Sequence, residues 1–581
     1  AAALVPLGVW LLLSGIDDLF VDLWWLARCR ARHLPARCNS PERLIAIFVP
    51  LWREEAVIAG MIEHNRAAID YARYHFFLGI YPNDEPTLEA VRELEAEHAC
   101  VHVALCPHDG PTSKADCLNW IYQRMQLYEE EQGARFDIIL IHDAEDLIHS
   151  QGPRAVNELL TSCDMVQVPV LALPTPFGEL THGVYCDEFA EYQMRDMPAR
   201  QSMGAFIPSC GVGTGYRREV LDRLAEHSQN RIFEPACLTE DYENGLRLHG
   251  LGARQAVVPI ARAGTTWLAT REYFPRNFQS ALVQRIRWVT GNVLQSWERH
   301  GWRGDLVQKY WLWRDRKSIV GSLVTAATNL AALYGLATLA GCAMAGAQWK
   351  LPAVCAALVP AWMLQATTLL LLWRIALRMW FAGLIYGAVF ALGVPVRALC
   401  ANALNSVAAI AAIVRFAQAK WRGEPLRWVK TAHNYPSREA LSEHKRPLRD
   451  ILIGAAYAEE SEIEAALASK PGGVELTDHL VAAGILSEDD LVEVLSLREG
   501  LPIAAVQAHE IPRRTGRALP ARVVRQWQVL PFQIETGTLY VAAPRLPADG
   551  VQDELRRFTS LRIRLHLMAR GDWEALVEQV L

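Results

Sequence analysis

The stretch Phe136-Asp137-Ile138-Ile139-Leu140-Ile141-His142-Asp143-Ala144-Glu145-Asp146 best predicts the fold of this chain. Its unbroken apolar run is typical of a strand that is covered on both faces, as in parallel α/β sheets. Ligands of such sheets bind beyond the carboxyl ends of the strands, where the acidic residues stand. Closely spaced carboxylates suit a hard divalent cation such as Mg²⁺ or Mn²⁺, which in turn could hold a diphosphate. A solvated acidic turn is the alternative interpretation of this segment alone.

The composition of the 581-residue chain indicates a soluble enzyme joined to membrane helices, because 51% of its residues are hydrophobic. The formal net charge of −6 and the absence of a basic, aromatic-rich stripe argue against a nucleic-acid binder. The twelve cysteines form no CxxC pair, so neither a zinc site nor a disulfide framework is expected. This usage fits soluble parts that lie in the reducing cytosol.

The first 33 residues are predicted to contain an N-terminal transmembrane helix. Asp17, Asp18 and Asp22 make it an unusual one, since acids in such a segment face other helices or a polar cavity instead of lipid. Basic residues follow from Arg28, and the positive-inside rule places that end of the helix in the cytoplasm.

The apolar region at 319–420 is predicted to form transmembrane or interfacial helices after a soluble region at 43–316. Its apolar segments are 319–346, 352–373, 379–396 and 399–417. Four crossings, or two crossings with interfacial helices, would both return the tail at 445–581 to the cytoplasm.

Further polar residues stand where a sugar-nucleotide site would need them. A buried strand is predicted to end at Pro50, with Glu54 just beyond it. Asp84 follows the next predicted strand and could accept a hydrogen bond from a nucleobase or ribose, or it could be a simple turn acid. Lys114 begins a predicted helix and could pair with phosphate, although a lone lysine at such a position is more often solvated.

The order of these segments resembles that of family 2 glycosyltransferases of the cellulose and chitin synthase type. The specific part of the resemblance is the combination of Thr239-Glu240-Asp241 with Gln284-Arg285-Ile286-Arg287-Trp288. It implies a GT-A glycosyltransferase domain over 43–316, an α/β fold with a mixed, Rossmann-like sheet. With its flanking helices and tail, the chain resembles more closely the phage-adsorption membrane glycosyltransferases of the NfrB type. An interfacial helix is the alternative interpretation of residues 284–288.

The resemblance implies a donor site for a UDP-sugar. Asp84 would contact the uridine and Asp143 the nucleotide, while Glu145 stands where the family usually has the second Asp of an Asp-x-Asp motif. Asp143, Glu145 and Asp146 are the candidate ligands of Mg²⁺ or Mn²⁺. Arg53 departs from the family, in which many members carry Asn at this position. The remaining substrate-binding candidates are Pro50, Glu54, Lys114, Gln284, Arg285, Arg287 and Trp288.

On the acceptor side, the resemblance implies that Asp241 is the general base, with Glu240 as the second catalytic candidate. Trp288 would stack on the acceptor sugar, and Gln284 would support that region. The run Gly211-Val212-Gly213-Thr214-Gly215 lacks the context of a dinucleotide-binding loop and would lie beside the acceptor.

We therefore expect a metal-dependent, inverting glycosyltransferase of the bacterial inner membrane, with its catalytic and tail domains in the cytoplasm. It would use a UDP-sugar, such as a UDP-N-acetylhexosamine, to extend a polysaccharide acceptor that leaves the cell through an outer-membrane or periplasmic partner. It would act as part of a phage receptor system. The alternatives are a lipid-phosphate glycosyltransferase and a non-catalytic membrane scaffold or receptor component.

The tail, residues 445–581, resembles the N-terminal (MshEN-like) domain of type II secretion ATPases, a small α plus α/β domain that in some families binds cyclic di-GMP. Its helical repeats keep the apolar skeleton of those binders but lack their Gly and Gln residues. Arg446, Arg449 and Arg498 could compensate by pairing with the phosphates. A docking module that keeps only the fold is the alternative.

Overall fold

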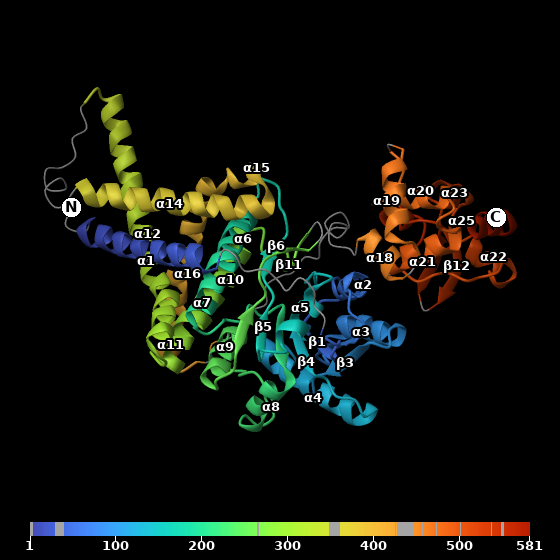
Figure 1. The fold of residues 1–581 in the computed structure, drawn as a ribbon, viewed down its shortest axis with the longest axis horizontal. Coiled ribbons are helices and arrows are strands. Elements are labelled where there is room, and N and C mark those ends of the chain that lie inside the picture. Colours follow the sequence, from blue (N-terminus) through green and yellow to red (C-terminus); the bar gives the residue numbers. More distant parts are fainter. Residues whose placement is uncertain are drawn as a thin grey trace. The chain divides into compact units, whose positions relative to one another are not determined.

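The computed structural model of the protein describes residues 4–29, 40–263, 266–347, 361–424, 426, 447–455, 457–471, 473–499, 501–535, 537–547 and 551–581. They form two compact units, of which the first comprises Ala1–Ala59 with Tyr71–Pro436, and the second Gly60–Asp70 with Ser437–Leu581. Each unit is described by itself (Figure 1).

A seven-stranded sheet with the order β3-β2-β1-β4-β7-β5-β8 forms the centre of the first unit (Figure 1). Strands β1 to β4 pair in parallel, whereas β7 runs antiparallel to both β4 and β5. The predicted mixed α/β sheet is therefore confirmed. The strands are β1 (Ile45–Pro50), β2 (Tyr74–Ile80), β3 (Val101–Leu105), β4 (Ile138–Ile141), β5 (Met165–Gln167), β7 (Thr214–Arg217) and β8 (Gln255–Val257).

The apolar runs that predicted β1 and β4 are buried because helices cover the sheet: every residue of β4 is buried. Phe48, Phe77, Ile121 and Phe136 belong to one core cluster between strands and helices. The helices of this region are α3 (Glu85–Glu97), α4 (Lys114–Gln132), α5 (Gly152–Leu159), α6 (Leu180–Glu191), α7 (Met197–Met203), α8 (Arg218–Glu226), α9 (Glu240–Gly250), α10 (Phe278–Trp288) and α11 (Ser296–His300), with π-helical turns η1 (Tyr192–Asp196) and η2 (Val289–Gln295). Most of α2 (Ile58–Ala68) belongs to the second unit.

Two small two-stranded sheets complete this unit. Strand β6 (Val170–Ala172) pairs in parallel with β11 (Thr270–Glu272), and β9 (Arg262–Ala263) pairs antiparallel with β10 (Thr266–Trp267).

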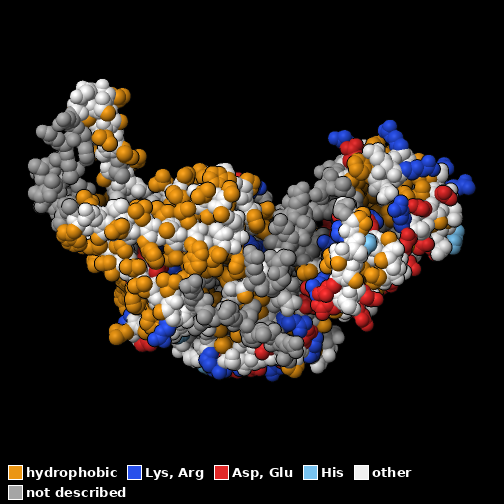
Figure 2. Space-filling model, turned by 45° about the horizontal axis from the view of Figure 1, so that its top comes forward, with side chains coloured by type: hydrophobic (Ala, Val, Ile, Leu, Met, Phe, Trp, Pro, Cys, Tyr) orange, Lys and Arg blue, Asp and Glu red, His pale blue; other side chains and the backbone are white. Residues whose placement is uncertain are grey.

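Three helices of the first unit, α12 (Leu306–Met344), α14 (Ala361–Tyr386) and α16 (Val394–Arg422), are long and apolar enough to cross a membrane. Figure 2 shows hydrophobic side chains over much of the surface of this unit, as expected for lipid-facing helices. The predicted boundary between segments 379–396 and 399–417 is wrong. Pro395 lies in the first turn of α16, where proline is tolerated, and α14 is followed only by the short helix α15 (Ala388–Ala391).

Helix α1 (Leu4–Arg28) directs its three aspartates toward other helices, as expected. Asp22 lies 2.9 Å from Arg195 of η1, and both side chains are only 2% exposed. Asp17 and Asp18 pair with basic side chains of α12 and α14, namely Arg314, Lys317 and Arg374. These ion pairs fix α1 to the two longer helices. Helix α1 is not among the three described helices that could cross a membrane by length and composition, so its transmembrane role remains a prediction.

The tail contains two packed parts, as predicted for a small α plus α/β domain. Helices α18 (Leu448–Gly454), α19 (Glu460–Ser469), α20 (Leu476–Ala482) and α21 (Glu488–Glu499) share one apolar cluster. Helices α23 (Ala521–Trp527) and α25 (Arg570–Val580) share a second cluster with a three-stranded sheet, and the short helix α22 (Arg513–Gly516) lies against β12 (Leu530–Glu535). That sheet consists of β12, β13 (Thr538–Ala543) and β14 (Arg562–Leu567), accompanied by η3 (Ala508–Glu510) and α24 (Val551–Leu555).

The buried ion pair of Arg397 and Asp187 joins α16 to α6, and its contribution to stability can be tested. Two N–H groups of Arg397 donate to the carboxylate at 2.7 and 2.8 Å, and the side chains are 1% and 3% exposed. The change Arg397→Met leaves Asp187 charged and alone, so we expect the free energy of unfolding in detergent to fall by about 3–5 kcal/mol. Chemical denaturation followed by tryptophan fluorescence measures it.

The double variant Arg397→Met/Asp187→Leu should recover most of that loss, because it also removes the buried charge. The exposed pair of Arg276 and Glu179 supplies a control, since Arg276→Gln should cost less than about 1 kcal/mol. A double variant as unstable as the single one would contradict this account.

Candidate active site

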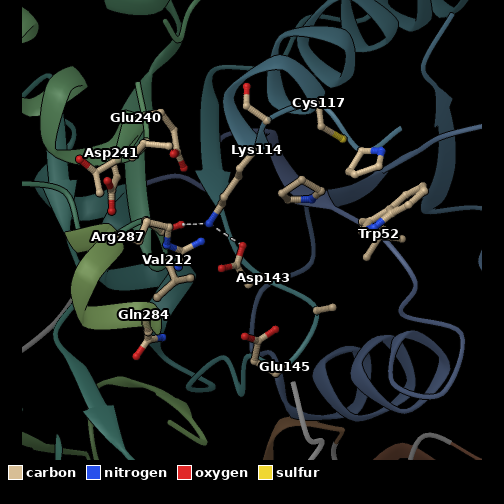
Figure 3. Close-up of a pocket in the computed structure, with 18 of the residues that line it drawn as sticks. Trp52, Lys114, Cys117, Asp143, Glu145, Val212, Glu240, Asp241, Gln284 and Arg287 are labelled. Carbon is tan, nitrogen blue, oxygen red and sulfur yellow. Dashed lines mark hydrogen bonds and ion pairs between the residues drawn. The ribbon is translucent and has the colours of Figure 1, made fainter. Parts of the chain in front are cut away.

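A pocket lies at the carboxyl ends of β1 and β4 and brings together most of the predicted site residues (Figure 3). These strand ends form the edge of the sheet where ligands of α/β proteins bind. The predicted residues that line the pocket are Pro50, Glu54, Lys114, Asp143, Glu145, Glu240, Asp241, Gln284, Arg287 and Trp288. Asp84, Asp146 and Arg285 do not line it.

Lys114 is a central cation of this pocket. Ser113 caps α4 by accepting a hydrogen bond from the Asp116 N–H, which places Lys114 at the first helical position. Its Nζ lies 2.6 Å from Asp143 Oδ1 and donates to the Gly211 carbonyl at 3.1 Å (Figure 3). Burial lowers the pKa of Lys114, but the neighbouring carboxylates raise it further, so the pKa stands above its ordinary value. Lys114 therefore carries its charge at neutral pH.

Glu240 and Asp241 begin α9 and face the same pocket as Lys114 and Arg287 (Figure 3). Burial and the charge of Asp241 raise the pKa of Glu240 to about 7. Burial also raises the pKa of Asp241, although Lys114 and the hydrogen bond from the Tyr242 N–H oppose the effect. Below about pH 7 Glu240 is therefore mostly neutral, and the two carboxylates titrate as a coupled pair.

Gly211 is fixed as glycine by its close approach to this pair. Its φ of 79° lies in the left-handed region, and a Cβ atom there would be 2.9 Å from Asp241 Oδ2 and 3.5 Å from Lys114 Nζ. Gly211 and Val212 both line the pocket, next to the candidate base. The glycine-rich run was the sequence signal for this contact.

The acidic cluster after β4 divides into two kinds of residue. Asp143 and Glu145 line the pocket (Figure 3). Asp146 is completely buried, accepts a hydrogen bond from the Asp143 N–H at 3.0 Å and lies 2.7 Å from His142 Nδ1. Burial raises the pKa of Asp146 well above its ordinary range. Its geometry suits a residue that holds the turn carrying Asp143.

Two carboxylates in the pocket fit a divalent cation that is shared with a substrate. Across the described residues, no group of three or more His, Cys, Asp or Glu side chains is arranged to hold a metal ion. Mg²⁺, however, is commonly bound by one or two carboxylates together with substrate phosphates. The donor set of Asp143 and Glu145 therefore fits Mg²⁺ or Mn²⁺ held jointly with a diphosphate.

The polar and aromatic residues of the segment 284–288 lie on opposite sides of α10, because successive helical residues are about 100° apart. Gln284, Arg287 and Trp288 share one face at spacings of three and four residues, and all three line the pocket. Arg285 lies on the other face, 2.6 Å from Glu188 and 3.0 Å from Asn405. It joins α10 to α6 and α16, so Arg287 is the arginine that is available to a ligand of the pocket.

Asp84 holds the loop after β1 in place. It is 4% exposed, and its carboxylate accepts a hydrogen bond from the Arg53 N–H. Arg53 has a φ of 56°, a left-handed conformation that Asn adopts more readily than Arg. This geometry explains why Asn suits the position, and it directs Trp52 to the pocket lining. A uridine contact by Asp84 stays a prediction.

Three aromatic residues of the lining were missed in the sequence. Trp52 and Tyr81 meet edge to face, with ring centroids 5.6 Å apart, and they lie two residues and one residue after the ends of β1 and β2. That position was a usable signal. Phe274 gave no signal, because β11 and the loop after it bring it to the pocket from far along the chain.

In the tail, the candidate regulatory arginines have different surroundings. Arg449 pairs with Glu460, and Arg498 lies 3.9 Å from Glu499. Arg446 lies outside the described residues.

Comparison with known proteins agrees with this architecture. The family "Glycosyltransferase like family 2" matches residues 41–291, and the MshEN domain matches residues 499–581. Bacteriophage adsorption protein B of Escherichia coli (strain K12) is 30% identical over 604 aligned positions, which cover 98% of this chain and 80% of that protein.

Among solved structures, the mannosyltransferase PcManGT of Pyrobaculum calidifontis, in complex with GDP-Man and Mn²⁺, is 18% identical. It covers 68% of this chain and 99% of its own, with a TM-score of 0.42. The structure of MshE with cdg is 23% identical and covers 23% of this chain and 99% of its own, with a TM-score of 0.21. The match to the curated relative spans nearly the whole chain. The protein therefore belongs to the family of bacteriophage adsorption protein B, as a family 2 glycosyltransferase with a C-terminal MshEN domain.

Proposed function

We propose that the protein is an inverting glycosyltransferase of the bacterial inner membrane that transfers a sugar from a UDP-sugar to a growing polysaccharide. The observation that carries the proposal is the pocket in which Lys114 and Arg287 lie among Asp143, Glu145 and Asp241. The polysaccharide would leave the cell with an outer-membrane or periplasmic partner, as part of a phage receptor system. Three helices of suitable length and apolarity support a place in the bilayer.

The donor diphosphate would lie between Lys114 and Arg287. A guanidinium matches phosphate oxygens through paired N–H groups, and the lysine supplies a compact charge. Asp143 and Glu145 would hold Mg²⁺ or Mn²⁺, which when bound offsets the negative charge that develops on the UDP leaving group. Asp146 would position Asp143 through its backbone N–H.

Asp241 would act as the general base. Its carboxylate takes the proton of an acceptor hydroxyl as that oxygen attacks the anomeric carbon, while the bond to the UDP oxygen breaks and its electron pair leaves with UDP. A single in-line displacement inverts the anomeric centre. Glu240 is mostly neutral below about pH 7, so it does not repel the donor diphosphate there.

The acceptor would lie against the α10 face that carries Trp288 and Gln284. Phe274 lines the same pocket, and its ring centroid is 6.5 Å from that of Trp288. Aromatic faces of this kind bind the apolar face of a sugar ring, and Gln284 can supply hydrogen bonds to hydroxyl groups.

Release of UDP by the purified full-length protein, across a panel of UDP-sugars with Mn²⁺ or Mg²⁺, tests the transferase proposal. We expect release from one donor, and we expect Asp241→Asn to lower its rate by about 10²–10⁴-fold, the usual contribution of a general base. Glu226→Gln, an exposed carboxylate on α8, serves as the control. No release from any donor, or full activity of Asp241→Asn, would support the scaffold alternative instead.

The raised pKa of Glu240 gives a second test, through the pH dependence of donor binding. Since its pKa is about 7, Glu240 is mostly neutral at lower pH and becomes charged as the pH rises through that value. The added charge repels the diphosphate, so KM for the donor should rise on the order of tenfold between about pH 6 and pH 8. Glu240→Gln should show no such rise. A profile unchanged by that substitution would contradict the assignment.

We also propose that the tail binds cyclic di-GMP and controls transfer, supported by its MshEN domain and by Arg449 and Arg498. Titration calorimetry of the full-length protein in detergent tests the binding. The double variant Arg449→Gln/Arg498→Gln should bind at least about tenfold more weakly, since each would lose a charge-assisted hydrogen bond. Absence of heat from the unaltered protein would leave the tail as a docking module.

A further inference from the structure

The tail contains a run of 511–534 in which every charged residue is an arginine. No Asp, Glu or Lys interrupts it. These residues, which we term the arginine face, are Arg513, Arg514, Arg517, Arg522 and Arg525. All are exposed, and no ion pair or side-chain hydrogen bond joins them to any other described residue. Five exposed arginines without an ion partner among the described residues create a positive local potential, which attracts an anionic partner.

The fold buries the apolar residues of this run and leaves its arginines exposed. Ile511, Leu519, Val523 and Val524 turn inward and join the core cluster around β12 and β13. On α23 the exposed Arg522 and Arg525 are three residues apart and share the outer face. Arg513 and Arg514 lie on the short helix α22, and Arg517 directly follows its last residue. Packing of the apolar residues therefore fixes the orientation of the basic ones.

Charge is segregated within the tail. The helical part from α19 to α21 is rich in exposed acids, namely Glu459, Glu460, Glu462, Glu464, Glu488, Asp489 and Glu493. Figure 2 shows Lys and Arg side chains along the upper right rim of the tail and Asp and Glu side chains along its lower edge. An anionic surface would be repelled by the acidic part and attracted by the arginine face, so approach in one orientation is favoured.

The chain tethers the tail to the apolar helices. Helix α16 ends with Lys420 and Arg422, and roughly 25 residues connect it to α18, a length that reaches at most about 85 Å. A tethered basic surface meets the membrane at a high effective concentration. Basic residues at the end of an apolar helix also mark the leaflet side on which anionic lipids attract positive charge.

We propose that the arginine face binds the headgroups of anionic phospholipids in the leaflet adjoining the tail. Juxtamembrane arginines each strengthen such binding about fivefold at moderate ionic strength. Binding would hold the MshEN domain against the bilayer, with the acidic helical part of the tail, which precedes that domain, turned toward the solvent. The proposal depends on neither the transferase reaction nor the binding of cyclic di-GMP.

Hydrogen exchange of the full-length protein in nanodiscs tests this proposal. Discs of phosphatidylcholine alone are compared with discs in which part of the lipid is phosphatidylglycerol. We expect amides of residues 511–529 to exchange at least about fivefold more slowly in the anionic discs. The protection should vanish at high salt, because the contacts are ionic and exposed. Both leaflets have the same composition, so the result is independent of membrane orientation.

The variant Arg513→Gln/Arg517→Gln/Arg522→Gln/Arg525→Gln should lose the protection and keep the exchange pattern of the β12–β14 sheet, which reports that it folds. Arg557→Gln/Arg570→Gln, in exposed pairs outside the arginine face, should keep it. Equal exchange in both kinds of disc would overturn the proposal. Protection by added polyphosphate or RNA, with no difference between the discs, would overturn it in favour of a soluble polyanion.

Discussion

The ion pair of Lys114 with Asp143 is the interaction on which the candidate site depends. Four carboxylates, those of Asp143, Glu145, Glu240 and Asp241, line one pocket at the edge of the sheet. Buried charges of one sign are costly unless a counter-charge lies among them. Lys114 supplies that charge at 2.6 Å from Asp143, and its position follows from the Ser113 cap of α4. The first turn of one helix thereby organises residues from three separate parts of the chain.

A second set of buried charges joins the apolar helices to the catalytic unit. The aspartates of α1 meet basic side chains of α12, α14 and η1, and Arg397 of α16 meets Asp187 of α6. Most of these side chains are buried, and a buried ion pair specifies one arrangement of helices more than it adds stability. Hydrophobic packing alone would allow the apolar helices to slide against one another. The ion pairs fix their register.

Much of the fold could be predicted from local patterns. The apolar runs of β1 and β4 identified central strands, and the acids after β4 identified the functional edge. The sequence did not show that β7 would insert antiparallel beside β4, because that pairing depends on contacts distant in the chain. The helix boundaries after α12 failed for a related reason. Pro395 was read as a break, although the first helical turn accepts proline.

The sequence predicted the pocket residues whose position follows from helical spacing. It could not predict those whose position depends on which side chains become buried. Helical periodicity alone could have separated Arg285 from Arg287, since two residues turn a helix by about 200°. By contrast, nothing in the acidic cluster distinguished Asp146, which is buried beneath the turn, from Glu145, which reaches the pocket. Phe274 joins the lining only through tertiary folding. Such residues are visible only once the neighbouring elements are placed.

Helix α10 contacts α16 on one face and the pocket on the other, so movement of α16 can reach the pocket. One face packs on α16, through Ile286 against Ala408 and Ala412, and the other face carries Trp288 into the pocket. A membrane helix adjusts its tilt to the thickness of the bilayer. Because α10 is rigid and bonded to α16 through Arg285 and Asn405, a change in that tilt would shift the surface against which an acceptor lies. In a bilayer that α16 crosses, as its length and apolarity allow, the thickness of the lipid would be a physical variable of the pocket.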